Sequence, residues 1–172
     1  MSEIFRGRII SLSQDEVVLP TGGRVTLDIV HHPGAAAIVA VDDGGAVALI
    51  NQFRHAAGGF IWEVPAGTLA PGESPDVCAR RELREETGLV AARWTALGSI
   101  LTTPGFSDER IHLYLARELT ESTAALDHDE VLTTSRIPLI RALGMIVSGE
   151  IEDAKSIAAL YLAHAALAGG AA

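Results

Sequence analysis

GTLAPGESPDVCARRELREETGL occupies residues 67–89, and the fold assignment depends on this stretch. The tripeptide SPD at 74–76 predicts a helix start, because it supplies a capping hydroxyl, a proline in the first turn and an acid near the positive helix end. We expect the helix to run to Thr87, where Gly88 is a suitable terminator. The stretch therefore predicts a glycine-containing loop that leads directly into a helix.

Three glutamates of this helix lie on neighbouring parts of one face. Glu86 follows Glu82 by four positions and Glu85 follows it by three, spacings that place side chains together on a helix. Like charges so placed repel one another unless cations lie among them, and Arg81 could pair with Glu85. Carboxylates without soft ligands nearby suit a hard divalent cation such as Mg²⁺ or Mn²⁺, which commonly acts on substrate phosphates. A solvated helix face with compensating arginines is the alternative interpretation.

The same stretch resembles the signature of the Nudix hydrolase family. That signature is a glycine, five residues, a glutamate, seven residues, Arg-Glu, an aliphatic residue, any residue, Glu-Glu, any residue, a glycine and an aliphatic residue. All of its fixed positions are matched here, by Gly67, Glu73, Arg81, Glu82, Leu83, Glu85, Glu86, Gly88 and Leu89. Agreement at so many positions disfavours the solvated helix face.

The resemblance implies a metal site on the helix, with Mg²⁺ as the expected cation and Mn²⁺ as the alternative. Glu82 and Glu86 are the expected ligands and catalytic residues. Glu85 is a further ligand, direct or through water, and the backbone carbonyl of Ala66 is an additional one. In this family water attacks a phosphorus of a pyrophosphate, while metals neutralise its oxygens and lower the pKa of the water.

Other residues of the signature have structural roles by the same resemblance. Glu73 and Arg81 are expected to pair and to hold the loop on the helix. Gly67 and Gly88 complete this structural set. Cys78 lies at a variable position, so we expect it to pack in the core rather than to react.

Looser motifs outside the signature resemble the ADP-ribose pyrophosphatase branch of the family. They are residues 51–54 and 62–67 before the signature, and residues 102–109, 126–130 and 148–156 after it. This likeness implies hydrolysis of ADP-ribose to AMP and ribose 5-phosphate. Two alternatives stay open: hydrolysis of another nucleoside diphosphate sugar, and a sensor that binds ADP-ribose without turnover. The intact glutamate set argues against the sensor.

Residues outside the signature supply substrate contacts and a general base in that branch. Arg54 resembles the arginine that contacts a substrate phosphate, and Glu63 and Glu109 are candidates for binding substrate or metal. Glu130 is the expected general base, because branch members use a mobile loop glutamate there, and Asp129 is the second choice. The ordinary alternatives are a surface salt bridge at Arg54 and a solvated acidic loop at the base.

Two further aromatic groups are expected to be structural. Trp62 could stack on a base, but packing in the core is the safer interpretation. The pair His31-His32 is assigned to local structure, because hard metal sites rarely use imidazole.

The composition limits the class of protein. The chain has 172 residues, 48% of them apolar, so one domain with a sizeable core is expected. The net charge of −9 argues against nucleic-acid and anionic-membrane binding, and leaves a small nucleoside diphosphate as the expected partner. One cysteine excludes a disulfide framework. No signal peptide or membrane-spanning run is evident, and we expect a cytoplasmic location.

The predicted elements follow the order strands, helix, strands, helices, which fits a mixed α/β sandwich. With the resemblance this becomes a Nudix fold, a mixed β-sheet between helices with a small N-terminal sheet. After the first 32 residues, strands are predicted at 36–41, 46–52, 60–64, 94–101, 111–117 and 131–137, and helices at 75–87, 138–147 and 153–168.

The N-terminal segment reads as short strands at 5–12, 16–19 and 25–30, with turns at 13–15 and 20–23. A small sheet of this kind needs something to pack against. The resemblance implies that residues 1–35 form a sheet exchanged between the two subunits of a homodimer. Residues 36–172 would then be the catalytic domain.

Overall fold

The computed structural model describes residues 2–125 and 131–170. Its helices are α1 (Pro75–Thr87), α2 (Leu139–Ser148) and α3 (Ala154–Ala168), with a 3-10 turn η1 (His55–Ala57). Its strands are β1 (Ser2–Arg6), β2 (Ser11–Val18), β3 (Arg24–His31), β4 (Ala35–Ala40), β5 (Ala46–Arg54), β6 (Gly59–Glu63), β7 (Ala66–Thr68), β8 (Leu89–Leu101), β9 (Arg110–Glu121) and β10 (Leu132–Pro138). Within the described ranges, no helix has the length and apolar character needed to cross a membrane.

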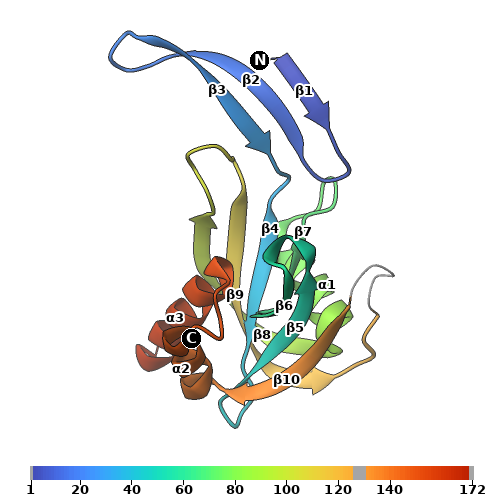
Figure 1. The fold of residues 1–172 in the computed structure, drawn as a ribbon. Helices are drawn as coiled ribbons and strands as arrows, with labels where there is room; N and C mark the ends of the chain where they lie inside the picture. Colours follow the sequence, from blue (N-terminus) through green and yellow to red (C-terminus); the bar gives the residue numbers. More distant parts are fainter. Residues whose placement is uncertain (1, 126–130, 171–172) are drawn as a thin grey trace.

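Two sheets form the centre of the main body of the molecule, which follows β3 along the chain. One has the strand order β7-β4-β9-β8 and the other the order β10-β5-β6. The first sheet is mixed, because β4 and β9 run parallel whereas β7 and β8 are antiparallel to their neighbours. Helices α2 and α3 lie on one side of these sheets and α1 on the other (Figure 1). The predicted mixed α/β architecture is confirmed.

Strand β4 lies at the centre of the core, and every one of its residues is buried. Its alternate side chains enter two separate apolar clusters. Ala37 and Val39 pack with residues of α2 and α3. Ala36 and Ile38 pack with residues of α1, among them Leu83. A continuous apolar run is what a strand covered on both faces requires, and this strand fixes α1 against the sheet.

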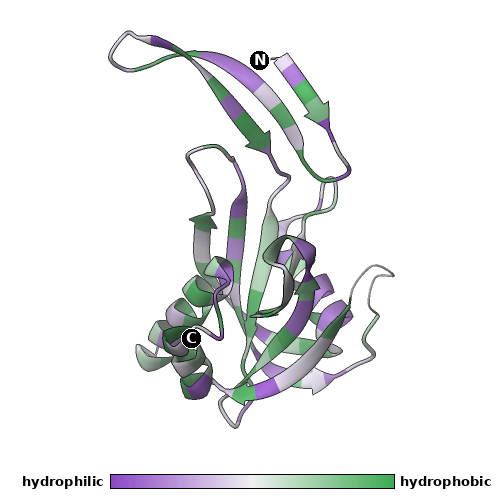
Figure 2. Ribbon diagram, viewed as in Figure 1, coloured by the Kyte–Doolittle hydropathy of each residue, from purple (hydrophilic) through white to green (hydrophobic). Residues whose placement is uncertain are grey.

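Strands β1, β2 and β3 form a separate antiparallel sheet that stands apart from the main body (Figure 1). Besides the chain itself, a short backbone bridge and the contact between His31 and Asp108 join it to the body. The N–H of Val30 donates to the carbonyl of Phe106, and the N–H of Asp108 donates to the carbonyl of Val30. The sheet contains apolar residues (Figure 2), of which Ile4 and Val18 are each more than half exposed.

The predicted strand at 25–30 and the turn at 20–23 agree with the structure within one or two residues, but the boundaries predicted for the first two strands are wrong. The predicted strand 5–12 is interrupted by a turn, in which the N–H of Gly7 donates to the carbonyl of Ile10. The predicted turn at 13–15 lies in the middle of β2, paired with residues of β3. The polar residues Ser13, Gln14 and Asp15 suggested a turn. In the structure the hydroxyl of Ser13 donates to the carboxylate of Asp15, and the backbone of all three residues is extended.

The predicted helices are confirmed within one residue at their starts. The capping prediction at Ser74 is wrong, because its hydroxyl donates to the carboxylate of Asp76 instead of capping the helix. Gly88 ends α1 in the left-handed conformation, as predicted. Strand β8 begins at Leu89, five residues earlier than predicted, so α1 passes into the sheet with only Gly88 between them.

Candidate active site

Gly67 lets the acidic helix approach the preceding strand closely. It lies in β7, and a Cβ placed on it would be 1.8 Å from Oε1 of Glu82. No side chain can occupy that position unless the Glu82 carboxylate moves. Gly67, the glycine of the signature, therefore leaves the space that the Glu82 carboxylate occupies over the backbone of β7.

Arg81 fastens the loop between β7 and α1 to the helix. Its Nε donates to Oε1 of Glu73 and its Nη2 to Oε2, both at 2.9 Å. This two-pronged hydrogen bond lowers the pKa of Glu73 from 4.5 to about 2. Nη2 also donates to the carbonyl of Thr68, at 3.3 Å. The expected pair of Glu73 and Arg81 is present in the structure.

The three glutamates of α1 lie where β7 meets the helix. Glu82 and Glu86 are 7% and 2% exposed. Nη1 of Arg81 donates to Oε1 of Glu82 at 2.6 Å and to Oε2 of Glu85 at 3.0 Å. Glu86 accepts a hydrogen bond from the N–H of Ala66 at 2.9 Å. Arg81 thus offsets the repulsion that the helical spacing of the glutamates creates.

The donor atoms at this junction are of the type that binds a hard cation. The donors are carboxylates and, at Ala66, a backbone carbonyl, which are the oxygen ligands that Mg²⁺ and Mn²⁺ prefer. As their side chains are placed, the described residues contain no ready cluster of three acidic, histidine or cysteine groups that could hold a metal. Arg81 explains this, because it pairs with carboxylates that a cation would otherwise neutralise.

A cavity of about 690 Å³ opens beside this junction. Pockets of this size hold drug-sized ligands. Its walls come from distant parts of the chain: Gly67 and Glu82 at the acidic junction, Arg54 at the end of β5, Glu109 in the loop before β9, and Arg8 in the turn between β1 and β2. The cavity therefore joins the acidic face of α1 to candidate anion-binding arginines.

Glu63 connects two cations in the wall of this cavity. Its side chain is almost fully buried, and Nε of Arg54 donates to its Oε2 at 2.9 Å. Nζ of Lys155 donates to its Oε1 at 2.6 Å. The sequence analysis did not find Lys155. The available signal was its singularity, since it is the only lysine among the 13 basic residues.

The remaining predicted residues lie in several environments. Glu109 lines the cavity. Its Oε1 lies 3.4 Å from Nδ1 of His32, a nitrogen that also accepts the N–H of Gly34. Glu130 and Asp129, the candidates for general base, lie outside the described residues.

Three side chains have the structural role that was expected of them. Cys78 is buried, which raises the pKa of its thiol to about 12. Trp62 packs against the larger apolar cluster. His31 contacts Ser13 and Asp108 at the base of the N-terminal sheet.

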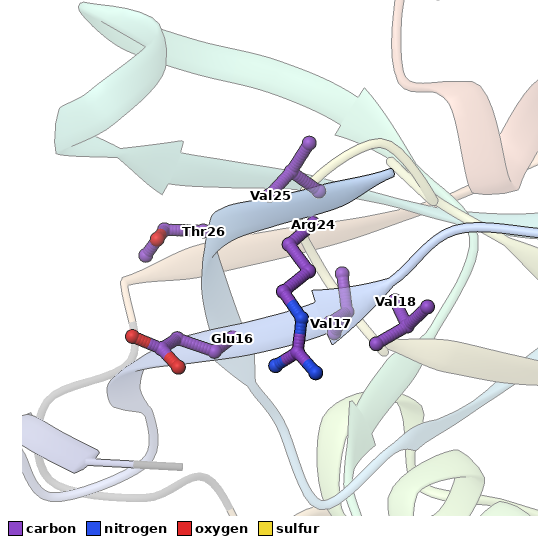
Figure 3. Close-up of a pocket in the computed structure, with 6 residues that line it drawn as sticks. All are labelled: Glu16, Val17, Val18, Arg24, Val25 and Thr26. Atoms are coloured by element: carbon purple, nitrogen blue, oxygen red, sulfur yellow. The ribbon is translucent and has the colours of Figure 1, made fainter. Parts of the chain in front are cut away.

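A second, smaller hollow of about 200 Å³ lies on the hairpin of β2 and β3 (Figure 3). Six residues line it: Glu16, Val17, Val18, Arg24, Val25 and Thr26. It contains one acid and one base and no part of the signature. The larger cavity is therefore the candidate active site.

Comparisons with known proteins agree with this geometry. A family model described as the NUDIX domain matches residues 30–160. The ADP-ribose pyrophosphatase of Mycobacterium tuberculosis (strain ATCC 25618 / H37Rv) is 43% identical over 95% of this chain and 80% of its own length. The ADP-ribose pyrophosphatase of Bacillus subtilis (strain 168) is 42% identical over 92% of this chain and 86% of its own.

A solved structure described as an ADP compounds hydrolase superposes with a TM-score of 0.85. The match covers 98% of this chain and 92% of that chain, and at 23% identity it shows a shared fold. With the family match, the two relatives and the signature folded into one acidic junction, the chain belongs to the Nudix family.

Proposed function

We propose that this Nudix pyrophosphohydrolase cleaves the pyrophosphate bond of ADP-ribose, with Mg²⁺ as its cofactor, and releases AMP and ribose 5-phosphate. Two relatives that share most of this chain are named for that activity. The observation that supports the proposal best is the cavity, because it places Glu82, one of the metal-type carboxylates of α1, in one space with Arg54. A diphosphate needs both cationic and metal partners, and this cavity offers them together.

Different residues of the chain would hold the cation, bind the substrate and accept the proton of the attacking water. Glu82, Glu85, Glu86 and the carbonyl of Ala66 hold the cation. When bound, Mg²⁺ supplies charge neutralisation on the pyrophosphate and a lowered pKa for the attacking water. The oxygen of this water bonds to one phosphorus, and the bridging oxygen leaves with the other phosphate group.

Side chains around the metal site would bind the substrate and remove the proton. Arg54 contacts a substrate phosphate, and Glu63, whose two oxygens are bound, acts through Arg54. Glu109 is a second substrate contact on the cavity wall. Glu130 accepts the proton of the water, so Glu130→Gln should lower kcat by about 10²–10⁴-fold with little change in KM. A larger loss in Asp129→Asn than in Glu130→Gln would transfer the role to Asp129.

A panel of substrates tests the proposal. Purified protein with Mg²⁺ is assayed against ADP-ribose, other nucleoside diphosphate sugars and dinucleotides, and the products are identified by chromatography. We expect the highest kcat/KM for ADP-ribose, with AMP as a product. A clear preference for another nucleoside diphosphate sugar would replace the substrate. Tight binding of ADP-ribose without turnover in Mg²⁺ or Mn²⁺ would favour the sensor.

We further propose that the protein acts as a cytoplasmic homodimer in which residues 1–35 pack on the partner copy. The support is the N-terminal sheet, which stands apart and leaves Ile4, Phe5 and Val18 more than half exposed. Arg8, in the turn between β1 and β2, lines the cavity. The position of this sheet would therefore affect the substrate site.

A further inference from the structure

The first turn of α3 contacts the strand that leads into the acidic junction. Three residues at the start of this helix, Asp153, Lys155 and Ser156, are involved. Nζ of Lys155 reaches Glu63 at 2.6 Å, and the hydroxyl of Ser156 accepts the N–H of Val64 at 2.9 Å. The two contacts each join residues that are 92 positions apart. Two consecutive residues of β6 and the following loop are thus held by two consecutive residues of α3.

Asp153 fixes the position of the lysine. It is the N-cap of α3, and its Oδ2 accepts the N–H of Ser156 at 2.9 Å. The same oxygen lies 3.0 Å from Nζ of Lys155. The ammonium group therefore lies between two carboxylates, and only 12% of its side chain is exposed. The backbone of Lys155 is held in α3 and its ammonium group is held by two carboxylates, so its side chain is fixed at one position in the cavity wall.

The geometry around Glu63 determines how Arg54 can be used. Glu63 gives one oxygen to Lys155 and the other to Arg54, and Arg54 is bound through Nε. Among the described residues, no other ion pair engages Arg54, whose side chain is 40% exposed at the cavity. Its two terminal nitrogens are therefore available to an anion in the cavity.

Without Lys155, this arrangement would change. Glu63 is buried, and one of its oxygens would lose its charged partner. A guanidinium and a carboxylate prefer two parallel hydrogen bonds, so Arg54 would be drawn into a two-pronged pair with Glu63. Terminal nitrogens used in that pair could no longer bind a phosphate.

We propose that Lys155 is a positioning residue for substrate binding: by occupying one oxygen of Glu63, it keeps the terminal nitrogens of Arg54 directed at the diphosphate. The role of the diphosphate rests on the proposed function, whereas the effect on Arg54 does not. Lys155 acts through Glu63 and takes no part in bond cleavage.

Kinetics of a double-mutant cycle test the inference. In Lys155→Met, the KM for ADP-ribose with Mg²⁺ should rise about ten-fold or more while kcat stays within about two-fold, the pattern of lost ground-state binding. Lys155→Arg should recover most of the loss, because a guanidinium can donate to the same oxygen. In an Arg54→Lys background, Lys155→Met should have little further effect, since the group that it positions is gone. Arg141→Met, which removes an exposed cation from α2, serves as the matched control and should behave like wild type.

A purely structural lysine would give another pattern. Lys155→Met would then lower kcat and stability to the same extent in both backgrounds, and that additivity would overturn the inference. So would an unchanged KM in Lys155→Met.

A readout without substrate separates this inference from the proposed function. In a crystal structure of Lys155→Met, we expect Arg54 to give two nitrogens to Glu63, whereas the wild type gives Nε alone. An unchanged Arg54 would overturn the inference even if ADP-ribose is the substrate. If the wild type does not hydrolyse ADP-ribose, the proposed function fails, and the position of Arg54 in this variant still decides the inference.

Discussion

At the scale of single residues, the site depends on close approaches that allow little substitution. Gly67 lies against the carboxylate of Glu82, and Arg81 divides its guanidinium among Glu73, Glu82 and Glu85. These are short-range contacts within one loop and one helix. The helical spacing therefore indicated the pair of Arg81 and Glu85, and the resemblance to the Nudix signature implied the pair of Glu73 and Arg81. The close approach of Gly67 to Glu82 was not predicted, because it depends on how β7 packs against α1.

Gly67→Ala should impair both activity and stability. The added Cβ would lie 1.8 Å from Glu82, so the carboxylate or β7 must move. Because the displaced atoms are the end of the Glu82 side chain, the cost should lie at the lower end of the ~1–3 kcal/mol of overpacking. We expect kcat for ADP-ribose to fall at least ten-fold, since the displaced group is an expected metal ligand. The matched control is Gly144→Ala in α2, where an added Cβ meets nothing within 4 Å. It should be neutral, or stabilising by about 1 kcal/mol, in thermal unfolding. Wild-type turnover in Gly67→Ala would contradict the role of this close approach.

The pair of Glu73 and Arg81 should make stability depend on pH in acid. Since the pKa of Glu73 is about 2 when folded and near 4.5 otherwise, the unfolded chain binds more protons between these values. The stabilisation of the folded protein by the pair of Glu73 and Arg81 is therefore full above about pH 4.5 and is lost as the pH falls towards 2. Compared with Glu73→Gln, the wild type should be more stable by about 2 kcal/mol at pH 7. Urea unfolding at several pH values should show this difference shrinking below pH 4.5. A difference that is constant from pH 7 to pH 2.5 would exclude the ionic contribution.

At the scale of elements, the sequence was a good guide to which elements exist and a poorer one to where they end. The helix of the signature was placed correctly because proline, acid and glycine mark its two ends. The N-terminal strands were divided wrongly, because the polar side chains of 13–15 satisfy one another in an extended strand. Lys155 was missed for a related reason: its contact with Glu63 depends on how α3 packs against β6 and leaves no local pattern.

The first turn of α3 allows a stability prediction. Ser156 is fully buried, and its hydroxyl accepts the N–H of Val64. Ser156→Ala leaves this buried donor without a partner, which costs about 1–3 kcal/mol. Ser148→Ala, at the exposed end of α2, is the control and should change the free energy of unfolding by less than about 0.5 kcal/mol. Equal effects in the two variants, measured by urea denaturation, would show that the bond to Val64 is not significant.

At the scale of the whole molecule, the N-terminal sheet is a surface with exposed apolar side chains. The sheet contains many apolar residues (Figure 2), and Ile4, Phe5, Val18 and Leu27 are exposed in the single chain. A small sheet of this kind needs something to pack against. We expect light scattering at micromolar concentration to give a dimer. Val18→Glu places a charge on this exposed face and should weaken the dimer. Val147→Glu, which adds the same charge to an exposed valine of α2, should leave it intact. A fully active monomeric wild type would refute the exchange of residues 1–35.

The central claim is that the acidic face of α1 performs metal-dependent hydrolysis of ADP-ribose. The most direct measurement is the release of AMP from ADP-ribose, with saturating Mg²⁺ and with chelator. The proteins compared are the wild type, Glu82→Gln, Glu86→Gln and Glu150→Gln, an exposed control in the loop between α2 and α3. We predict turnover for the wild type and the control only when Mg²⁺ is present. Glu82→Gln and Glu86→Gln should lose several orders of magnitude in turnover while their far-ultraviolet circular dichroism stays native. Near-normal release of AMP by both of these variants would contradict the account.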